Sequence, residues 1–292
     1  MKLTIAKDAG YCFGVRDAVN MAYDAAEKYG NVHMLGSIVH NEKVVNDLEN
    51  AGAKIVRSLS DVPEGSPILF RAHGTVNSLW EEAKAKKMNI VDATCPLVTE
   101  IHEEVIKLAE DGRQIIVIGD HGHDEVIAIA DQVDNSIVVA TSEEAHQLKK
   151  YKRAGLVSQS TQAIENVQEI INIIMTKVFD LHFVNTICYP TKRNHEQIKE
   201  MAVENDIMVI IGSFTSANSK RLTQLASDRN PCSYQVTGAS DLKPEWFEKK
   251  EKIGISAGAS TPDYLITEVK EGIEQIYKEK LWQKEHSKLK LA

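Results

Sequence analysis

Residues 95–119, CPLVTEIHEEVIKLAEDGRQIIVIG, decide the fold, because a cysteine, an amphipathic helix and a buried strand follow one another directly. Pro96 suits the first position of a helix, and apolar residues then recur every three or four positions as far as Ala109. The apolar run IIVIG that follows ends at Gly119 and is typical of a short buried strand. This segment therefore predicts a cysteine at the start of a helix that leads into a sheet.

The same arrangement occurs three times along the chain. Cys12, Cys95 and Cys188 each lie 24 residues before a glycine that closes an apolar run. A second apolar run in each copy ends in small polar residues; these runs are ILFRAHGT, GLVSQST and IGISAGAST, and they end at Thr75, Thr161 and Thr261. The chain is therefore one unit of roughly ninety residues repeated three times, with one thiol in each copy.

Alternating strands and helices with short connections predict the α/β class, in three pseudo-equivalent units with mainly parallel sheets that share a centre. We expect units at 1–88, 89–180 and 181–270, followed by a C-terminal helix and tail at 271–292. In parallel sheets, ligands bind at the carboxyl ends of the strands. The polar loops that follow the three glycines, and the ends of the second apolar runs, both fall at those ends.

Composition and charge narrow the class of protein. Among the 292 residues, 43% are hydrophobic and 26% are charged, as in ordinary globular proteins. No stretch approaches the ~20 apolar residues that span a bilayer, and residues 1–11 lack the apolar segment of a signal peptide, so we expect a cytoplasmic protein without a membrane partner. The net charge of −8 argues against a nucleic-acid binder but does not exclude a small anionic substrate.

The three repeated cysteines are candidate metal ligands. A cysteine directly before a helix is stabilised as thiolate by backbone N–H groups and the helix dipole, and thiolate is the form that binds metals. None of them has a second cysteine nearby, unlike the ligands of zinc ribbons. Three thiolates on a four-iron cluster would leave one iron open to polarise a substrate oxygen. The alternative is three inert buried thiols, but their equivalent positions favour ligation. Cys232 has no counterpart and is interpreted as structural.

Polar side chains recur at matching positions after the three glycines. The residues four positions after each glycine are His40, His123 and Ser216, and those six positions after are Glu42, Glu125 and Asn218. The ends of the second apolar runs add His73, Thr75, Ser160, Thr161, Ser260 and Thr261. If the units surround one centre, these groups converge there and suit a phosphate or diphosphate. Glu125 is either a buried proton donor or an ordinary carboxylate in the first turn of a helix.

Nine segments, in order and spacing, resemble the 4-hydroxy-3-methylbut-2-enyl diphosphate reductase family: GYCFGVRDAV, GSIVHNE, RAHGT, VDATCPLV, GHDEV, SQST, NTICYPTKRN, SANSKRL and SAGASTPD. The resemblance implies a trefoil of three α/β units around a 4Fe-4S cluster that is held by Cys12, Cys95 and Cys188, with the fourth iron on the substrate hydroxyl. It assigns His40, His73, His123, Ser216, Asn218 and Ser260 to the diphosphate pocket. It assigns Glu125 as the proton source and Thr161 to the hydroxyl end.

The reaction that the resemblance implies is an oxidoreductase step of isoprene biosynthesis, the last of the non-mevalonate pathway. The hydroxyl of (E)-4-hydroxy-3-methylbut-2-enyl diphosphate is removed reductively to give isopentenyl and dimethylallyl diphosphates, with reduced ferredoxin or flavodoxin as electron donor. Two residues depart from the family pattern: Ala217 stands where a second serine is common, and Ser160 where threonine is common. A backbone N–H at 217 can still serve the diphosphate, so we expect this change to alter affinity rather than chemistry.

Three other functions are compatible with a three-thiolate site. A non-redox hydratase or dehydratase would use the same open iron, and net electron consumption per turnover separates it from a reductase. A non-catalytic iron–sulfur sensor would normally need a DNA-binding or partner-binding module, and the sequence has no obvious one. A structural zinc trefoil is distinguished by metal analysis.

Overall fold

The computed structural model describes residues 1–289, which contain three four-stranded sheets in which all paired strands are parallel. The predicted fold class, three α/β units with parallel sheets, is confirmed. The chain divides into two compact units, one formed by Met1–Cys12 with the chain from Arg193 onward, the other by Phe13–Lys192. The first contains one of the sheets and the second contains two.

The first sheet of the unit Phe13–Lys192 has the strand order β3-β2-β4-β5. Its elements, in chain order, are α1 (Phe13–Tyr29), β2 (Val32–Leu35), α2 (Glu42–Asn50), β3 (Ala53–Val56), a 3-10 turn (Leu59–Asp61), β4 (Pro67–Phe70), α3 (Asn77–Ala85) and β5 (Asn89–Asp92). Alanines recur at helical spacing on the buried side of α1, which packs on β2, β3 and β4. Small side chains there allow the helix to approach the sheet closely.

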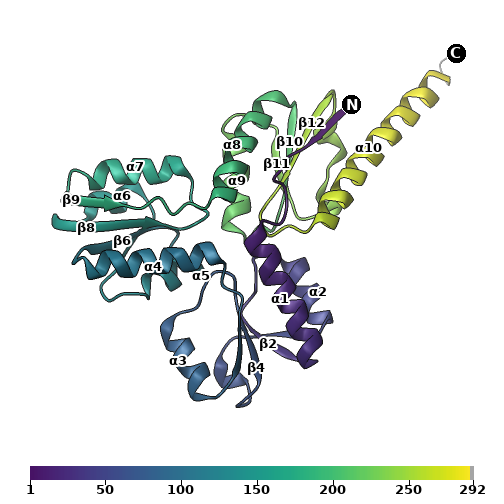
Figure 1. Cartoon of the computed structure of the whole chain (residues 1–292). Helices are drawn as coiled ribbons and strands as arrows, with labels where there is room; N and C mark the ends of the chain where they lie inside the picture. The colour runs from purple at the N-terminus through teal and green to yellow at the C-terminus, as the bar shows by residue number, and fades with distance from the viewer. Residues whose placement is uncertain (290–292) are drawn as a thin grey trace. The chain divides into compact units, whose positions relative to one another are not determined.

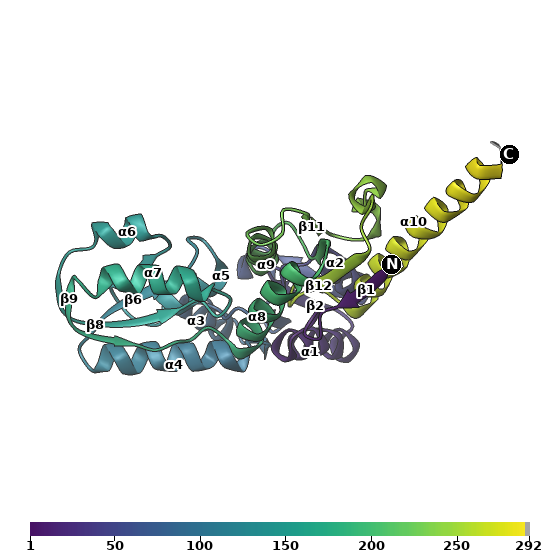
Figure 2. The same cartoon turned by 90° about the horizontal axis from the view of Figure 1, so that it is seen from above.

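The second sheet of this unit repeats the order as β7-β6-β8-β9. Its elements are α4 (Pro96–Glu110), β6 (Gln114–Ile118), α5 (Asp124–Ala130), β7 (Ile137–Val139), α6 (Ser142–Gln147), β8 (Tyr151–Ser158), α7 (Ile164–Ile174) and β9 (Val178–Phe183). Apolar residues of α6 and α7 pack on one face of the sheet, and those of α4 and α5 pack on the other (Figures 1 and 2). Residues 95–119 form the predicted helix α4 and strand β6.

The third sheet, in the other unit, has the order β1-β12-β10-β11. Its elements are β1 (Lys2–Ile5), α8 (Tyr189–Glu204, which belongs to this unit from Arg193 on), β10 (Ile207–Ile211), α9 (Ala217–Ser227), β11 (Ser233–Val236), 3-10 turns at Ala239–Asp241 and Pro244–Phe247, β12 (Lys252–Ala257) and α10 (Asp263–Leu289). The predicted C-terminal helix thus begins before residue 271. The end of its predicted tail, 290–292, lies outside the described residues.

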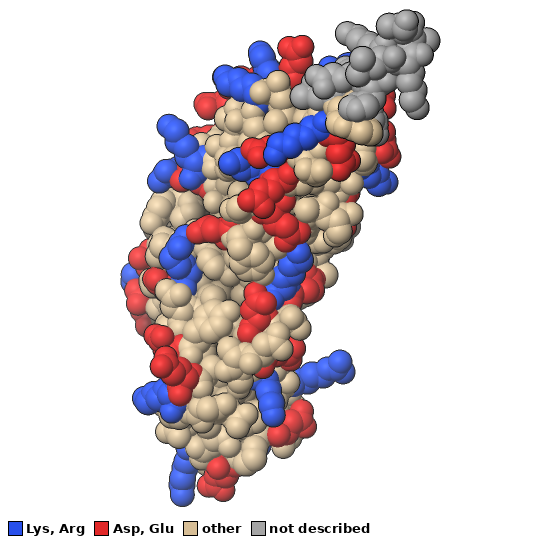
Figure 3. All heavy atoms as spheres, turned by 90° about the vertical axis from the view of Figure 1, so that its right-hand side faces the viewer, with Lys and Arg blue, Asp and Glu red and all other residues tan. Residues whose placement is uncertain are grey.

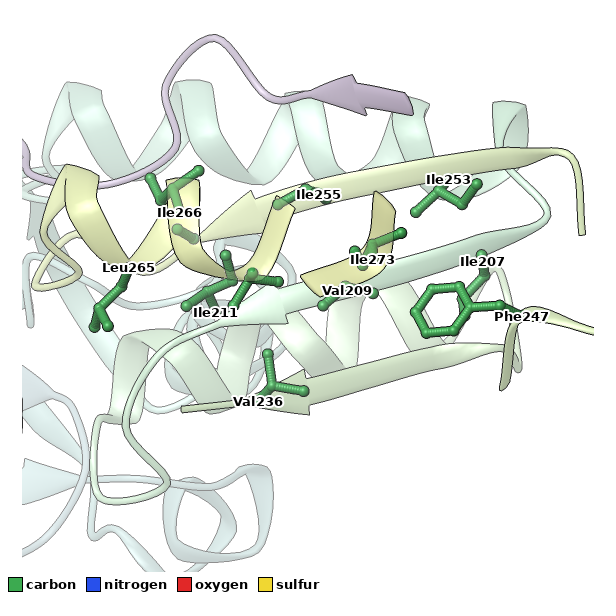
Figure 4. Packing of buried hydrophobic residues seen from close by; sticks show 12 residues of the cluster. Ile207, Val209, Ile211, Val236, Phe247, Ile253, Ile255, Leu265, Ile266 and Ile273 are labelled. Atoms are coloured by element: carbon green, nitrogen blue, oxygen red, sulfur yellow. The ribbon is translucent and has the colours of Figure 1, made fainter. Parts of the chain in front are cut away.

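Alternation along β10 builds a core on both faces of this sheet. Ile207, Val209 and Ile211 face one way and pack with Phe247 and the apolar side of α10, as Figure 4 shows. Met208 and Ile210 face the other way and pack against α8 and α9. A central parallel strand that is buried on both faces has to be apolar throughout, which explains the continuous run IMVII.

Each sheet takes its fourth, edge strand from the residues that precede a cysteine. β5 precedes Cys95, β9 precedes Cys188, and β1 precedes Cys12. Sheet membership therefore changes at the cysteines, whereas the unit boundaries near residues 88 and 180 stay predictions. The third sheet is completed by the N-terminal strand, with Lys2 paired to Lys252. This arrangement places all three cysteines at the carboxyl end of an edge strand.

The helices and the charged side chains on the surface are those of a chain with ordinary hydrophobic and charged content. No helix in the described part of the chain is long and apolar enough to cross a bilayer. On the face drawn in Figure 3, lysine and arginine side chains are interspersed with aspartate and glutamate. That face lacks the continuous positive charge that attracts the phosphate backbone of a nucleic acid.

Candidate active site

The backbone N–H of each repeated cysteine donates a hydrogen bond to a loop at the carboxyl end of the neighbouring strand. Cys12 N bonds Ala259 O at 3.4 Å, after β12; Cys95 N bonds Ala72 O at 3.0 Å, after β4; Cys188 N bonds Ser160 O at 2.9 Å, after β8. These loops hold Ser260, His73 and Thr161, which are predicted site residues. In every copy, one local contact therefore joins a thiol residue to a loop that carries candidate substrate ligands.

Three histidines of the unit Phe13–Lys192 form one cluster. His40 lies between β2 and α2, His73 follows β4, and His123 is the N-cap of α5, so three separate segments contribute. Their ring centroids are 4.5 Å apart for His40 and His73, 5.3 Å for His40 and His123, and 5.6 Å for His73 and His123. The structure thus brings together the three histidines that the sequence assigned to one pocket.

Burial favours the neutral form of two of these imidazoles, His40 and His73. Burial lowers the pKa of His73 well below its ordinary value, and the neighbouring His40, His123 and Arg71 lower it further. Burial also lowers the pKa of His40, although the negative charge of Asp124 raises it. A neutral imidazole both donates and accepts hydrogen bonds, so the cluster can donate to anionic oxygens without a fixed positive charge.

Glu125 is buried in the first turn of α5, with 2% of its surface exposed. Its Oε1 accepts a hydrogen bond from Ser160 N at 2.5 Å, and its Oε2 accepts one from Ser160 Oγ at 2.9 Å. Its own N–H donates to Nδ1 of His123 at 3.2 Å. An ordinary first-turn carboxylate would extend into solvent, so the geometry favours a functional role for this group. The hydroxyl of Ser160, which departs from the family pattern, makes one of these contacts.

The thiols of Cys95 and Cys188 lie near each other and near Glu125. Burial raises the pKa of the Cys188 thiol; its contact with Thr191 Oγ1 at 3.0 Å lowers it, and the charges of Glu125 and Cys95 raise it. At Cys188, burial therefore opposes the thiolate form that the start of α8 favours. A bound cation would reverse that balance.

Gly14, in the first turn of α1, lies against Cys95. A Cβ added at Gly14 would overlap the Cys95 sulfur and would lie 3.3 Å from its Cβ. Gly14 is the second residue after Cys12 in the sequence. Only a residue without a side chain allows this close approach.

The other unit, considered by itself, presents a hydroxyl- and amide-rich loop cluster. Ser216 is the N-cap of α9 and its Oγ accepts a hydrogen bond from Ser219 N at 3.3 Å. Asn218 is half-buried in the first turn of α9, and Ser260 is buried after β12. These predicted residues lie at the carboxyl ends of β10 and β12, beside the first-turn N–H groups of α9. Such a helix start binds anions.

Sequence reasoning missed one polar residue of this cluster. Ser219 is fully buried, and within residues 1–289 its Oγ has no hydrogen-bond partner. The hydroxyl packs against the glycines that end the two strands, Gly212 and Gly258. A buried hydroxyl without a partner is costly, so it is an additional candidate donor to an anion. No local pattern distinguishes it from other helix serines.

Sequence reasoning also missed an ion pair beside the histidines. Arg71 Nη1 lies 2.6 Å from Asp124 Oδ2, and both side chains are about one-quarter exposed (23% and 25%). Gly36, with a φ of +75°, lies against the guanidinium. Asp124 Oδ2 is also 3.9 Å from His40 Nε2. Arg71 lies in RAHGT and Asp124 in GDHGHDE, so their position in loops after strands was the available signal.

We expect Arg71→Gln to raise the pKa of both His40 and His73. The Arg71 cation lowers both values, and its removal would also leave Asp124 to attract a proton onto His40. The measurement is an NMR titration of the histidine C–H signals, with the exposed Arg57→Gln as control. Titration curves identical to the wild type would show that Arg71 does not act on the cluster.

Three other residues singled out in the sequence have contacts within their own unit. Thr161 accepts a hydrogen bond from Gln159 Nε2 at 3.1 Å. Thr261 is buried, and its Oγ1 donates to Ile211 O at 3.0 Å, so it supports the loop. Cys232 lies at the edge of the third core and receives a hydrogen bond from Lys250 Nζ at 3.3 Å.

Comparison with known proteins adds independent information. The family model described as LytB protein matches residues 3–274. A relative from Geotalea uraniireducens, named 4-hydroxy-3-methylbut-2-enyl diphosphate reductase, is 41% identical over 281 residues, which cover 96% of this chain and 99% of the relative. One from Aquifex aeolicus with the same name is 38% identical over 279 residues, which cover 94% and 96%.

Solved structures agree with these matches. A structure described as (E)-4-hydroxy-3-methyl-but-2-enyl diphosphate reductase, the terminal enzyme of the non-mevalonate pathway, matches with a TM-score of 0.71 and 37% identity over 94% of this chain and 100% of that chain. The E-1-hydroxy-2-methyl-but-2-enyl-4-diphosphate reductase from Plasmodium falciparum matches with a TM-score of 0.88 and 28% identity, over 94% and 87%.

Proposed function

Because the chain belongs to the LytB protein family, we propose that it catalyses the reaction for which its relatives are named, reduction of (E)-4-hydroxy-3-methylbut-2-enyl diphosphate. The family resemblance inferred from nine sequence segments is thereby confirmed. The products are isopentenyl and dimethylallyl diphosphates. The C–O bond of the hydroxyl breaks, two electrons enter, one proton goes to carbon, and a second proton leaves with the hydroxyl as water.

The residues fit a 4Fe-4S cluster with three thiolate ligands, Cys12, Cys95 and Cys188. None of the three is in a disulfide; they lie at equivalent positions, each is hydrogen-bonded to a site loop, and none has a second cysteine beside it in sequence. Cys95 and Cys188 lie within electrostatic reach of each other in one unit. When bound, the cluster would supply electrons and a Lewis-acidic iron at its fourth corner.

The substrate diphosphate is bound by two groups of side chains in this proposal. One is the cluster of His40, His73 and His123; the other is Ser216, Asn218 and Ser260 with the start of α9. Ala217 contributes only its backbone there. Binding at the diphosphate is remote from the C–O bond, so it orients the allylic end and excludes water without taking part in bond breaking. Thr161 lies at the hydroxyl end.

Glu125 holds the proton in this proposal. The N–H of Ser160 donates to one carboxyl oxygen and Ser160 Oγ donates to the other, so both contacts fix the orientation of the carboxyl group. Proton delivery to either end of an allylic system explains why two products form. The electron donor would be reduced ferredoxin or flavodoxin, and the compartment would be the cytoplasm.

One observation carries the proposal: in all three copies the cysteine N–H is bonded to the loop that also holds a candidate substrate ligand. The test is anaerobic turnover of the reconstituted protein with the hydroxylated allylic diphosphate and a reduced viologen dye. We expect two electrons consumed per substrate and both five-carbon diphosphates. Conversion of the substrate to a different product without dye oxidation would instead identify a hydratase or dehydratase, and no turnover by a protein with intact cluster would identify a sensor.

We expect His40→Ala or Asn218→Ala to weaken substrate binding by about tenfold to a hundredfold and to change kcat less. Each removes a hydrogen bond to a charged group, which is worth about 1.5–3 kcal/mol. The measurement is KM together with the Kd of the substrate in calorimetry. His182→Ala, an exposed histidine on β9, is the control. Unchanged affinity in both variants would contradict the assignment of the pocket.

A further inference from the structure

The cluster of His40, His73 and His123 has the composition of a transition-metal site in its own right. Each imidazole offers one ligand nitrogen, and these three nitrogens all lie within 4.8 Å of one another. They come from three different segments that a common fold holds together, within one compact unit. This grouping involves none of the three cysteines.

The chemical state of the cluster suits metal binding. Metals bind the neutral imidazole, and burial favours that form for His40 and His73. Nδ1 of His73 is buried and has no hydrogen-bond partner within residues 1–289. A bound cation would satisfy that nitrogen, which otherwise loses its solvation without compensation.

The geometry indicates which ions fit. Three imidazoles favour zinc, copper, nickel or cobalt over magnesium or calcium, which prefer oxygen ligands. Zn–N bonds of about 2.0–2.1 Å require nitrogens roughly 3.4 Å apart in a tetrahedron. The rings must therefore close inward when all three bind one ion. Nδ1 of His123 accepts the 3.2 Å hydrogen bond from Glu125 N, so its Nε2 carries the proton. Metal binding through Nε2 would move that proton to Nδ1, and the hydrogen bond that caps α5 would be lost.

Charged neighbours complete the environment. Asp124 Oδ2, 3.9 Å from His40 Nε2, supplies a negative charge beside the ligands, and Arg71 pairs with it. A carboxylate next to a ligating histidine is the usual outer partner at zinc sites. Three protein ligands leave the fourth position of the ion open.

We propose that His40, His73 and His123 form a second metal site that binds a late transition metal such as Zn²⁺ through three imidazoles when the substrate is absent. The site is independent of the thiols and does not require the proposed reductase activity. Because it uses the side chains assigned to the diphosphate, metal and substrate binding compete. Excess zinc would then inhibit at this site.

The test uses Co²⁺ as the probe, added anaerobically to the full-length metal-free chain. Cobalt bound by imidazoles gives visible d–d bands without the near-ultraviolet sulfur-to-cobalt charge-transfer band that thiolate ligands produce. In the wild type and in the control His182→Asn, we expect one equivalent with the nitrogen-type spectrum, in addition to any cobalt that the thiols bind. His73→Asn should weaken that binding by at least about tenfold, because a ligand is lost.

Two results would overturn the proposal. One is cobalt binding that always carries the charge-transfer band, which would assign the metal to the cysteines alone. The other is a nitrogen-type spectrum that His73→Asn leaves unchanged. If circular dichroism shows that His73→Asn is unfolded, His40→Gln, a partly exposed position of the same cluster, decides the question by the same two criteria.

Discussion

Glu125→Gln is expected to lower kcat by about two to four orders of magnitude, the range that general acid catalysis contributes. Glutamine has the same shape, and its amide can keep both contacts to Ser160, accepting from the N–H and donating to Oγ. What it lacks is a transferable proton. The change therefore separates proton delivery from structure.

The measurement is anaerobic steady-state turnover with KM, alongside iron and sulfide content. We expect the iron content to match the wild type and KM to change by less than the turnover does, because neither a thiol nor the proposed diphosphate pocket is altered. Glu144→Gln is the matched control: this carboxylate accepts from Ala140 N at 2.8 Å in the first turn of α6, outside the site. A Glu125→Gln enzyme with near-normal kcat would remove Glu125 from the proton path.

Gly14→Ala is expected to abolish most cluster assembly. The added methyl group would occupy the place of the Cys95 sulfur, so either the thiol turns away or α1 shifts. Overpacking of this kind costs about 1–3 kcal/mol in stability. Displacement of the Cys95 sulfur matters more for assembly than this loss of stability, because a cluster held by three thiolates has no other protein ligand to replace it.

Iron and sulfide per chain after reconstitution, and the visible absorbance of the cluster, measure this effect. Gly155→Ala is the matched control, because a methyl group there would meet Leu108 Cβ at 2.9 Å in the core and no thiol. We expect the control to lose stability but to keep its iron. Full iron content in Gly14→Ala would show that Cys95 is not a ligand or that its position is not limited by α1.

Local patterns in the sequence were sufficient for the elements and for the loops that carry the candidate site residues. The cysteine, helix and strand of 95–119 are where periodicity placed them, because burial of one helix face and of a whole central strand leaves a pattern over neighbouring residues. The same repeat logic placed the histidine cluster, since loops at matching positions lie at the same ends of parallel strands.

Contacts between distant segments were not accessible in that way. No local pattern indicates that Lys2–Ile5 closes the sheet of Lys252–Ala257, that Arg71 pairs with Asp124, or that Gly14 makes room for Cys95. The burial that raises the pKa of the Cys188 thiol likewise depends on segments far apart in the chain, so no local pattern indicates it.

The sequence by itself determined three α/β repeats, one thiol in each, and the identity of the polar loops, because these depend on residue type and spacing along the chain. Only the tertiary structure decided which strand completes each sheet, which side chains share a pocket and which of them are buried. Those properties depend on packing between residues far apart in sequence, and packing sets the distances and the loss of solvent that turn a list of polar residues into a site.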